Sequence, residues 1–292
     1  MRVKLLGIKD VAVCKTIILS LLLIFIIVVL IGKNSNAVMR FMVGQEIGLK
    51  TADFNQVKTD NFVIKYTIID DKDIDMVANA SEYAYEKVTG FFASKPRNKT
   101  MVVVYPDTIS LAQSFGWDKS QKAEGVYWAG SIRIISPQLW QEQVPLTDDA
   151  DLLQAGPLVH EFAHLMVDEQ TRGNYNRWWT EGIAQYAEKK ITGFEFDEPF
   201  ASEKEVFIYS LDHLNKKFDG DDSLKAYWQA LQIIEYIAAN DGEASLFCIM
   251  DHLGEGDTLR QAITKTLSVD YDEWEQELYK ALQNNAVKRC KF

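Results

Sequence analysis

The feature that most constrains this chain is an apolar helical segment that carries two histidines and a glutamate. Residues 157–168 read PLVHEFAHLMVD. Apolar residues flank each polar one, so a helix formed here has to be buried. His160 and His164 are four residues apart and therefore lie on one helix face, one turn from each other. Because a buried imidazole needs a polar partner, another element must present one to this face.

The spacing of the two histidines predicts a metal site. On one helix face, two neutral imidazole nitrogens reach a single Zn²⁺ ion at about 2.0–2.1 Å. Glu161 follows His160 directly and points roughly 100° around the helix from it. Its carboxylate is therefore expected beside the metal rather than on it. There it is placed to take a proton from a water molecule and pass it to a leaving amine.

A second segment supplies a third candidate ligand. Residues 177–186 read RWWTEGIAQY, and Glu181 stands near the start of an apolar helix, 17 residues after His164. A turn is expected at Gly173 and Asn174, which lets the two helices pack with Glu181 facing the histidines. Two histidines and one glutamate leave a coordination position open, as catalytic zinc sites require.

These two motifs resemble those of the gluzincin metallopeptidases. HEFAH matches the HExxH pattern, and WWTEGIAQY is similar to the W-x-x-E-G-x-A-x-Y helix of the M1 aminopeptidase branch. The chain looks closest to the peptidase MA-like domains of exported bacterial proteins. The resemblance implies an α+β, thermolysin-like zincin fold and hydrolysis of a peptide or protein substrate. It also implies one Zn²⁺ bound by His160, His164 and Glu181, with Glu161 as general base.

The resemblance extends with less detail to an oxyanion-stabilising residue. Residues 226–230 read AYWQA and are similar to the Tyr-x-x-small helix start of the aminopeptidase branch. This implies that Tyr227 donates a hydrogen bond to the developing oxyanion. Tyr209 and His213 are the other candidates for that role. Alternatively, Tyr227 heads an amphipathic helix and is an ordinary packing residue.

Other parts of the family pattern match less closely. Residues 125–130 stand where related enzymes have an edge strand that pairs with the substrate backbone, although an ordinary core hairpin also fits. Gln185 occupies a position where related enzymes often carry a supporting acid, and Asp168 is the alternative support. The interval from His164 to Glu181 is shorter than in the M1 aminopeptidases, so aminopeptidase specificity does not follow.

The N-terminal region carries a candidate membrane anchor. Residues 16–32 read TIILSLLLIFIIVVLIG, a run of 17 residues without a charge, which is near the minimum for a transmembrane helix. Lysines precede it and are expected to stay in the cytoplasm. We therefore expect residues 1–36 to be a cytoplasmic stub with a single-pass signal anchor, placing the rest outside the cell membrane. The alternative is a secreted protein cleaved after Ala37.

The remaining chain divides by its periodicity. Residues 37–60 are polar and predict a juxtamembrane spacer before a catalytic domain over 61–292. Its first lobe, 61–145, is predicted to be α+β, and its second lobe, 146–292, helical. The elements expected in the first lobe are strands at 62–69 and 101–105, helices at 73–92 and through 113–115, and a hairpin over 124–135. Those expected in the second are helices at 152–170, 181–192, 202–218, 224–239, 244–253, 258–267 and 271–286.

The net charge limits the class of binding partner, and the cysteines bear on lipid attachment and disulfide formation. The chain has a net charge of −11, and its first 36 residues hold five basic and one acidic residue, or +4, which leaves −15 on residues 37–292. Such an acidic body is unsuited to nucleic acid. Cys14 precedes the apolar run and is not placed as in a lipoprotein. Cys248 and Cys290 could form one disulfide in an oxidising compartment, which their positions alone do not establish. The oligomeric state is not indicated.

Two alternatives to an active peptidase stay open, and a third is disfavoured. The domain could bind zinc or peptide without turnover, or it could be a structural domain with a fortuitous motif. In the latter case Glu161 and Glu181 would be helix-start carboxylates, and the histidines core residues. An intramembrane protease is disfavoured because HEFAH lies outside the membrane-length segment.

Overall fold

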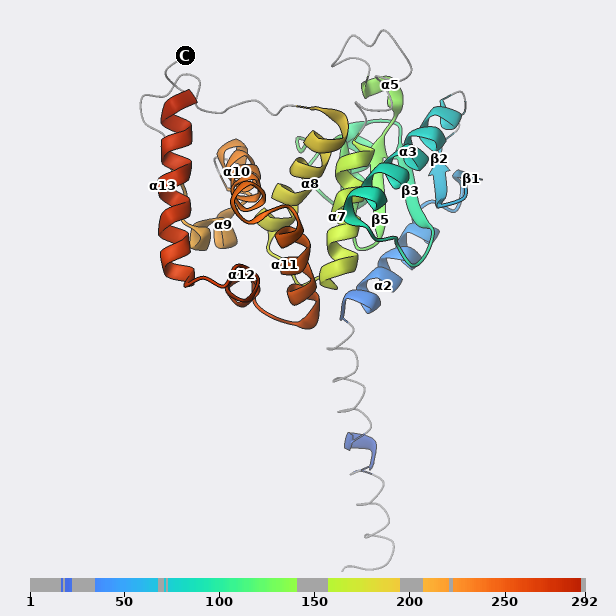
Figure 1. Cartoon of the computed structure of the whole chain (residues 1–292). Coiled ribbons are helices and arrows are strands. Elements are labelled where there is room, and N and C mark those ends of the chain that lie inside the picture. The colour runs from blue at the N-terminus through green and yellow to red at the C-terminus, as the bar shows by residue number, and fades with distance from the viewer. Residues whose placement is uncertain are drawn as a thin grey trace, which may run out of the picture. The chain divides into compact units, whose positions relative to one another are not determined.

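The computed structural model describes residues 17, 19–22, 35–67, 71, 73–140, 157–194, 207–220 and 223–289. The chain divides into two compact units, residues 1–50 and 51–292. Figure 1 shows the elements along the chain.

The first unit contains the expected anchor, most of which lies outside the described residues. Of residues 16–32, the structure describes Ile17 and residues 19–22, which are helical. Among the described residues, no helix has both the length and the apolar character needed to cross a membrane. Helix α2 (Ser35–Lys50) follows. Most of the segment expected to be a polar spacer is therefore helical, and Asn55–Lys58 within it forms strand β1.

The second unit begins with a five-stranded sheet in the order β1-β2-β3-β5-β4. Strands β2, β3 and β5 run parallel to one another, whereas β1 and β4 pair antiparallel with β2 and β5. Strand β4 lies at the edge of the sheet and is joined to β5 by a turn. The two turn residues, Ala129 and Gly130, both have positive φ, as tight hairpins favour. The strands are β1 (Asn55–Lys58), β2 (Phe62–Tyr66), β3 (Thr100–Tyr105), β4 (Gly125–Trp128) and β5 (Ser131–Ile135).

Helices make up most of the rest, so the expected α+β class is confirmed. The helices between the strands and just after them are α3 (Ile74–Phe92), α4 (Thr108–Phe115) and α5 (Pro137–Trp140). Those of the later part are α7 (Leu158–Thr171), α8 (Arg177–Thr192), α9 (Leu211–Lys217), α10 (Ser223–Asp241), α11 (Ala244–Glu255), α12 (Leu259–Leu267) and α13 (Tyr271–Arg289).

Two helices differ from the prediction within the described residues. Helix α8 begins at Arg177, four residues before the predicted start, because Trp178 and Trp179 are buried on it and extend its apolar face. The helix predicted over 202–218 is short, since residues 207–210 are not helical and Ser210 caps α9 through its hydroxyl, which accepts from His213 N. Residues 152–156 and 202–206, also predicted to be helical, lie outside the described residues.

Helix α7 is the central element of this unit. It packs against α3, β4 and β5 on one side and against α8 and α11 on the other. Its apolar residues are almost fully buried, among them Leu158, Phe162 and Met166. Each such side chain contributes roughly 1.5–3 kcal/mol when it leaves water. A helix enclosed on several sides explains why this segment is apolar around its whole circumference.

Close packing of α8 on α10 depends on Gly182. A Cβ atom at this position would lie 2.6 Å from the carbonyl oxygen of Ala230 and 2.7 Å from Ile234 Cγ1. The absence of a side chain therefore lets the backbones of the two helices approach. This approach brings the first turns of α10 alongside the residue that precedes Gly182, which is Glu181.

We expect Gly182→Ala to lower the free energy of unfolding by about 1–3 kcal/mol, because the added methyl group meets backbone that has to shift. Gly90→Ala is the matched control. Gly90 also lies within a helix, but its Cβ would have no atom within 4 Å, so alanine there should raise stability by about 0.4–1 kcal/mol. Denaturant unfolding of both variants measures this difference, and equal effects would contradict the packing described.

Candidate metal centre

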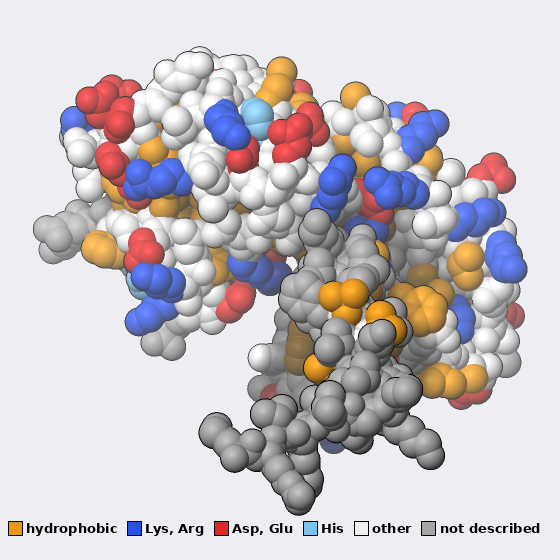
Figure 2. Space-filling model, turned by 90° about the horizontal axis from the view of Figure 1, so that it is seen from below, with side chains coloured by type: hydrophobic (Ala, Val, Ile, Leu, Met, Phe, Trp, Pro, Cys, Tyr) orange, Lys and Arg blue, Asp and Glu red, His pale blue; other side chains and the backbone are white. Residues whose placement is uncertain are grey.

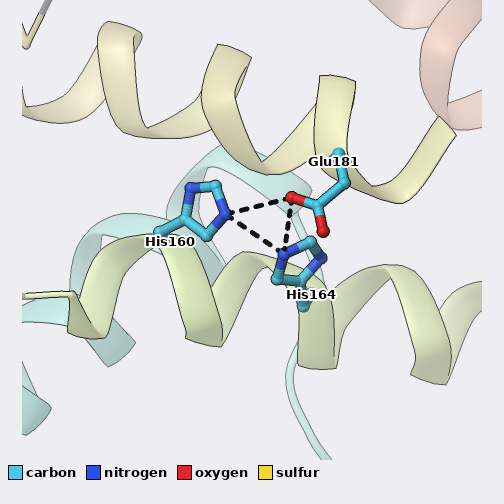
Figure 3. Close-up of side chains that lie close together, drawn as sticks. All are labelled: His160, His164 and Glu181. Carbon is cyan, nitrogen blue, oxygen red and sulfur yellow. Dashed lines mark hydrogen bonds and ion pairs between the residues drawn. The ribbon is translucent and has the colours of Figure 1, made fainter. Parts of the chain in front are cut away.

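Three side chains from α7 and α8 converge on one point. His160 Nε2 and His164 Nε2 are 3.1 Å apart, and each lies 3.4 Å from Glu181 Oε2. Figure 3 shows both imidazoles rising from α7 toward the carboxylate that descends from α8. Ligands at about 2.05 Å in a tetrahedral zinc site stand about 3.3 Å from one another. These three atoms therefore have the mutual spacing that one zinc ion requires.

The outer nitrogen of each histidine is held by a second contact. His160 Nδ1 lies 2.9 Å from Glu188 Oε2, and His164 Nδ1 lies 2.7 Å from the Thr180 hydroxyl oxygen. Both partners are on α8. Contacts at Nδ1 orient the rings so that both Nε2 atoms face Glu181, and a carboxylate partner also makes the imidazole a stronger ligand.

Glu161 is buried beside this group and touches strand β4. Its Oε2 accepts a hydrogen bond from the Tyr127 backbone N–H at 2.5 Å. A Cβ atom on Gly125 would lie 2.8 Å from Glu161 Cγ, so only glycine lets the strand pass this close. Burial raises the pKa of the Glu161 carboxyl, and the repulsion of Glu181 adds to this effect, whereas the two histidines oppose it. A raised pKa makes the carboxylate a better proton acceptor.

The second oxygen of Glu181 is held by two other side chains. Arg177 Nη2 lies 3.0 Å from Glu181 Oε1, and the Tyr227 hydroxyl donates to the same oxygen at 3.4 Å. Burial alone would raise the pKa of Glu181, but His164, His160 and Arg177 together hold it well below its usual range. The carboxylate is thus ionised, with Oε1 engaged and Oε2 directed at the histidines.

Of the three candidates for the oxyanion role, Tyr227 is the one that contacts the predicted ligands. Its hydroxyl joins Glu181 and also accepts a hydrogen bond from Arg177 at 3.2 Å. Burial and the charge of Glu181 raise the pKa of Tyr227, so the hydroxyl keeps its proton at neutral pH and can donate a hydrogen bond. Tyr209 and His213 instead stack on each other, with ring centroids 4.5 Å apart.

The supporting residues differ from those that the sequence suggested. Asp168 accepts a hydrogen bond from the Tyr127 hydroxyl and so ties β4 to α7. Gln185 donates to the backbone oxygens of Glu181 and Tyr227. The acid that contacts the Nδ1 atom of His160 is Glu188, which was not predicted from the sequence. Its spacing of seven residues from Glu181, two helical turns on one face, is the signal that could have identified it.

A second group with potential metal ligands is less suited to an ion. His252, Glu255 and Asp257 lie near one another at the end of α11. Asp257 already binds Lys265 at 2.6 and 2.8 Å, and the Glu255 side chain is 71% exposed. A bound ammonium group and an exposed carboxylate both weaken the attraction for a cation.

Comparison with known sequences agrees with this geometry. The profile of the peptidase MA superfamily matches residues 127–284, more than half of the 292 residues. The chain belongs to the peptidase MA superfamily. Among curated proteins, no sequence matches. The superfamily match covers strand β4 from Tyr127, both helices of the candidate metal centre and helix α10, which carries Tyr227. Members of the peptidase MA superfamily are generally zinc-dependent, and the donors found here suit that ion.

We expect Glu188→Gln to weaken zinc binding by roughly 10- to 100-fold, because a neutral amide orients and polarises His160 less well. Glu235→Gln is the control. Glu235, on α10, contacts Lys189 of α8, the helix that carries Glu188, but it contacts neither histidine. Competition with a chromophoric chelator measures both affinities. Equal affinities for the two variants would show that the Glu188 contact has no role in metal binding.

Proposed function

We propose that this chain is a zinc-dependent peptidase of the gluzincin type, with a thermolysin-like arrangement of its catalytic domain. The observation that carries the proposal is the 3.1–3.4 Å spacing of His160 Nε2, His164 Nε2 and Glu181 Oε2. Membership of the peptidase MA superfamily supports it. Buried donors with zinc spacing, beside a carboxylate that is not itself a ligand, suit hydrolysis better than a closed structural site.

The proposed ligands leave Glu161 free to act as the base. A zinc ion held by the three ligands would act as a Lewis acid, lowering the pKa of water and polarising the substrate carbonyl. Glu161 would accept a proton from the attacking water and return it to the departing amine. Its burial, which raises its pKa, suits both steps because the carboxyl can hold the proton between them.

Tyr227 and strand β4 are proposed to handle the substrate. The Tyr227 hydroxyl, 3.4 Å from Glu181 Oε1, is a protonated donor next to the ligands and would stabilise the oxyanion. Strand β4 is an edge of the sheet, and an extended peptide can add to such an edge by backbone hydrogen bonds. Because the Tyr127 N–H of β4 donates to Glu161, a peptide along this strand would lie next to the base.

The proposed location is the outer side of the cell membrane, with a single N-terminal span. The uncharged run of 17 residues over 16–32 supports it. Helix α2 follows and bears large apolar side chains that are 39–81% exposed, a surface suited to the boundary between lipid headgroups and acyl chains. They are Val38, Met39, Phe41, Met42 and Leu49. Secretion after cleavage near Ala37 is the alternative, but Ala37 lies within α2, which would have to unwind for the cut.

The proposed partner is a peptide or protein rather than a nucleic acid. Figure 2 shows basic and acidic side chains interspersed over one face of the molecule. Residues 37–292 carry a net charge of −15, which follows from −11 for the chain and +4 for residues 1–36. Nucleic acid would be repelled by this balance, whereas an extended peptide depends on backbone hydrogen bonds.

Cleavage of a diverse peptide mixture, read by mass spectrometry, tests the proposed activity. We expect the zinc-loaded protein to cut peptides and Glu161→Gln to do so about 10²- to 10⁴-fold more slowly, with zinc content unchanged. Equal cleavage by both proteins would exclude Glu161 as the base. If neither protein cleaves while both bind zinc, the chain is a binding domain without turnover.

Tyr227→Phe tests the oxyanion role. Loss of the hydroxyl should lower kcat by about 10²- to 10³-fold, with KM and zinc affinity nearly unchanged, because the donor acts mainly on the transition state. Tyr236→Phe on the same helix is the matched control and should keep full activity. A rise in KM alone, or equal activity of the two variants, would contradict this role.

A further inference from the structure

A cavity of about 600 Å³ lies beside the first turn of α8. Its walls come from that turn, from α9 and the residues on either side of it, and from the start of α10. The lining residues that matter for its chemistry are Arg177, Tyr209, His213, Lys217, Phe218 and Asp219. Arg177 also contacts the proposed ligand Glu181, whereas the other five residues have no role in the proposed hydrolysis.

Arg177 connects this cavity to the candidate metal centre. Its Nη2 lies 3.0 Å from Glu181 Oε1 and donates to the Tyr227 hydroxyl at 3.2 Å. The same side chain is 51% exposed and lines the cavity. Only the Arg177 side chain would therefore separate a group bound to it in the cavity from the proposed zinc ligand Glu181 and the proposed oxyanion donor Tyr227.

The cavity is basic in a chain that is acidic. Three basic residues line it, Arg177, Lys216 and Lys217, against one acid, Asp219, a formal balance of +2. Lys216 is engaged by Asp212 at 2.9 Å. Within the part of the chain that the structure describes, the Lys217 ammonium forms no ion pair or hydrogen bond. The Asp219 side chain is 68% exposed, and its carboxylate lies 3.5 Å from Arg177 Nε. An exposed ion pair at this distance is weak.

Aromatic rings form another part of the cavity wall. The Tyr209 and His213 rings stack with an interplanar angle of 5°, and Phe218 is buried against the Tyr227 ring with centroids 4.9 Å apart. These rings cover part of the cavity with apolar surface, and a charge contact made against such a surface is stronger than one in open water. A guanidinium group is also planar and matches a carboxylate with two parallel hydrogen bonds.

We propose that this cavity is a substrate subsite that binds a carboxylate, with Arg177 and Lys217 as its cations. The proposal rests on the proposed peptidase function and specifies the substrates of that same site. The carboxylate is either an acidic side chain near the scissile bond or the C-terminal carboxylate of the peptide. The two sources have the same chemistry at the cavity and differ in which peptides are bound.

Peptide binding to the full-length, zinc-loaded Glu161→Gln protein tests this assignment without cleavage. One peptide series carries a single Glu or Gln at each position in turn, and another carries a C-terminal carboxylate or carboxamide. We expect the carboxylate form to bind about 10- to 100-fold more tightly in one of the two series. The series that shows the preference identifies the source of the carboxylate.

Lys217→Glu and Lys58→Glu, each added to Glu161→Gln, locate the preference. Lys217 lines the cavity, whereas Lys58 is an exposed lysine on β1 at the opposite edge of the sheet from β4. Lys217→Glu should abolish the preference and Lys58→Glu should leave it intact. A preference that survives equally in both variants would overturn the assignment. Lys217 is used rather than Arg177 because a change at Arg177 also disturbs Glu181.

Two further outcomes separate this proposal from the peptidase proposal. If the wild type cleaves peptides but carboxylate and amide forms bind equally, the carboxylate subsite is wrong and the peptidase activity stands. If the preference depends on Lys217 but the wild type cleaves no peptide, the peptidase proposal fails and the cavity remains a carboxylate-binding site.

Discussion

The burial of polar groups on α7 is the constraint on which the rest of the structure depends. Glu161 and His164 are each only 7% exposed, and a buried imidazole or carboxylate without partners costs several kcal/mol. Helix α8 supplies the partners of the two histidines through Glu181, Thr180 and Glu188, and strand β4 supplies the Tyr127 N–H to Glu161. Packing of α8 against α7 is therefore tied to a fixed arrangement of nitrogen and oxygen atoms, and that arrangement has the spacing of a zinc site.

Two glycines permit the approaches that complete this arrangement. Gly182 lets α10 come against α8, which brings Tyr227 to Glu181. Gly125 lets β4 pass over Glu161, which brings the Tyr127 N–H to the carboxylate. The proposed substrate strand, base, ligands and oxyanion donor thus meet because the backbone approaches closely at two points. Arg177 then extends the same group outward into the basic cavity.

The sequence allowed the convergence of His160, His164 and Glu181 to be predicted because spacing fixes direction within one helix. His160 and His164 share a face at any helix position, and the α+β class followed from the change from strand to helix periodicity. Contacts between helices were harder to predict. Glu188 was missed in favour of Asp168, since the rotation of α8 against α7 decides which acid meets His160. The Arg177–Glu181 pair is local, four residues apart on α8, whereas the contact of Arg177 with Tyr227 and its place in the cavity depend on where α9 and α10 lie.

X-ray absorption at the zinc edge of the purified protein tests whether His160, His164 and Glu181 bind zinc. We expect one zinc per chain with only nitrogen and oxygen neighbours at about 2.0–2.1 Å, and with the outer-shell scattering of two imidazoles. His160→Ala and His164→Ala should each remove the bound zinc and its absorption signal. Absence of stoichiometric metal, sulfur in the first shell, or an unchanged spectrum in either variant would contradict this prediction.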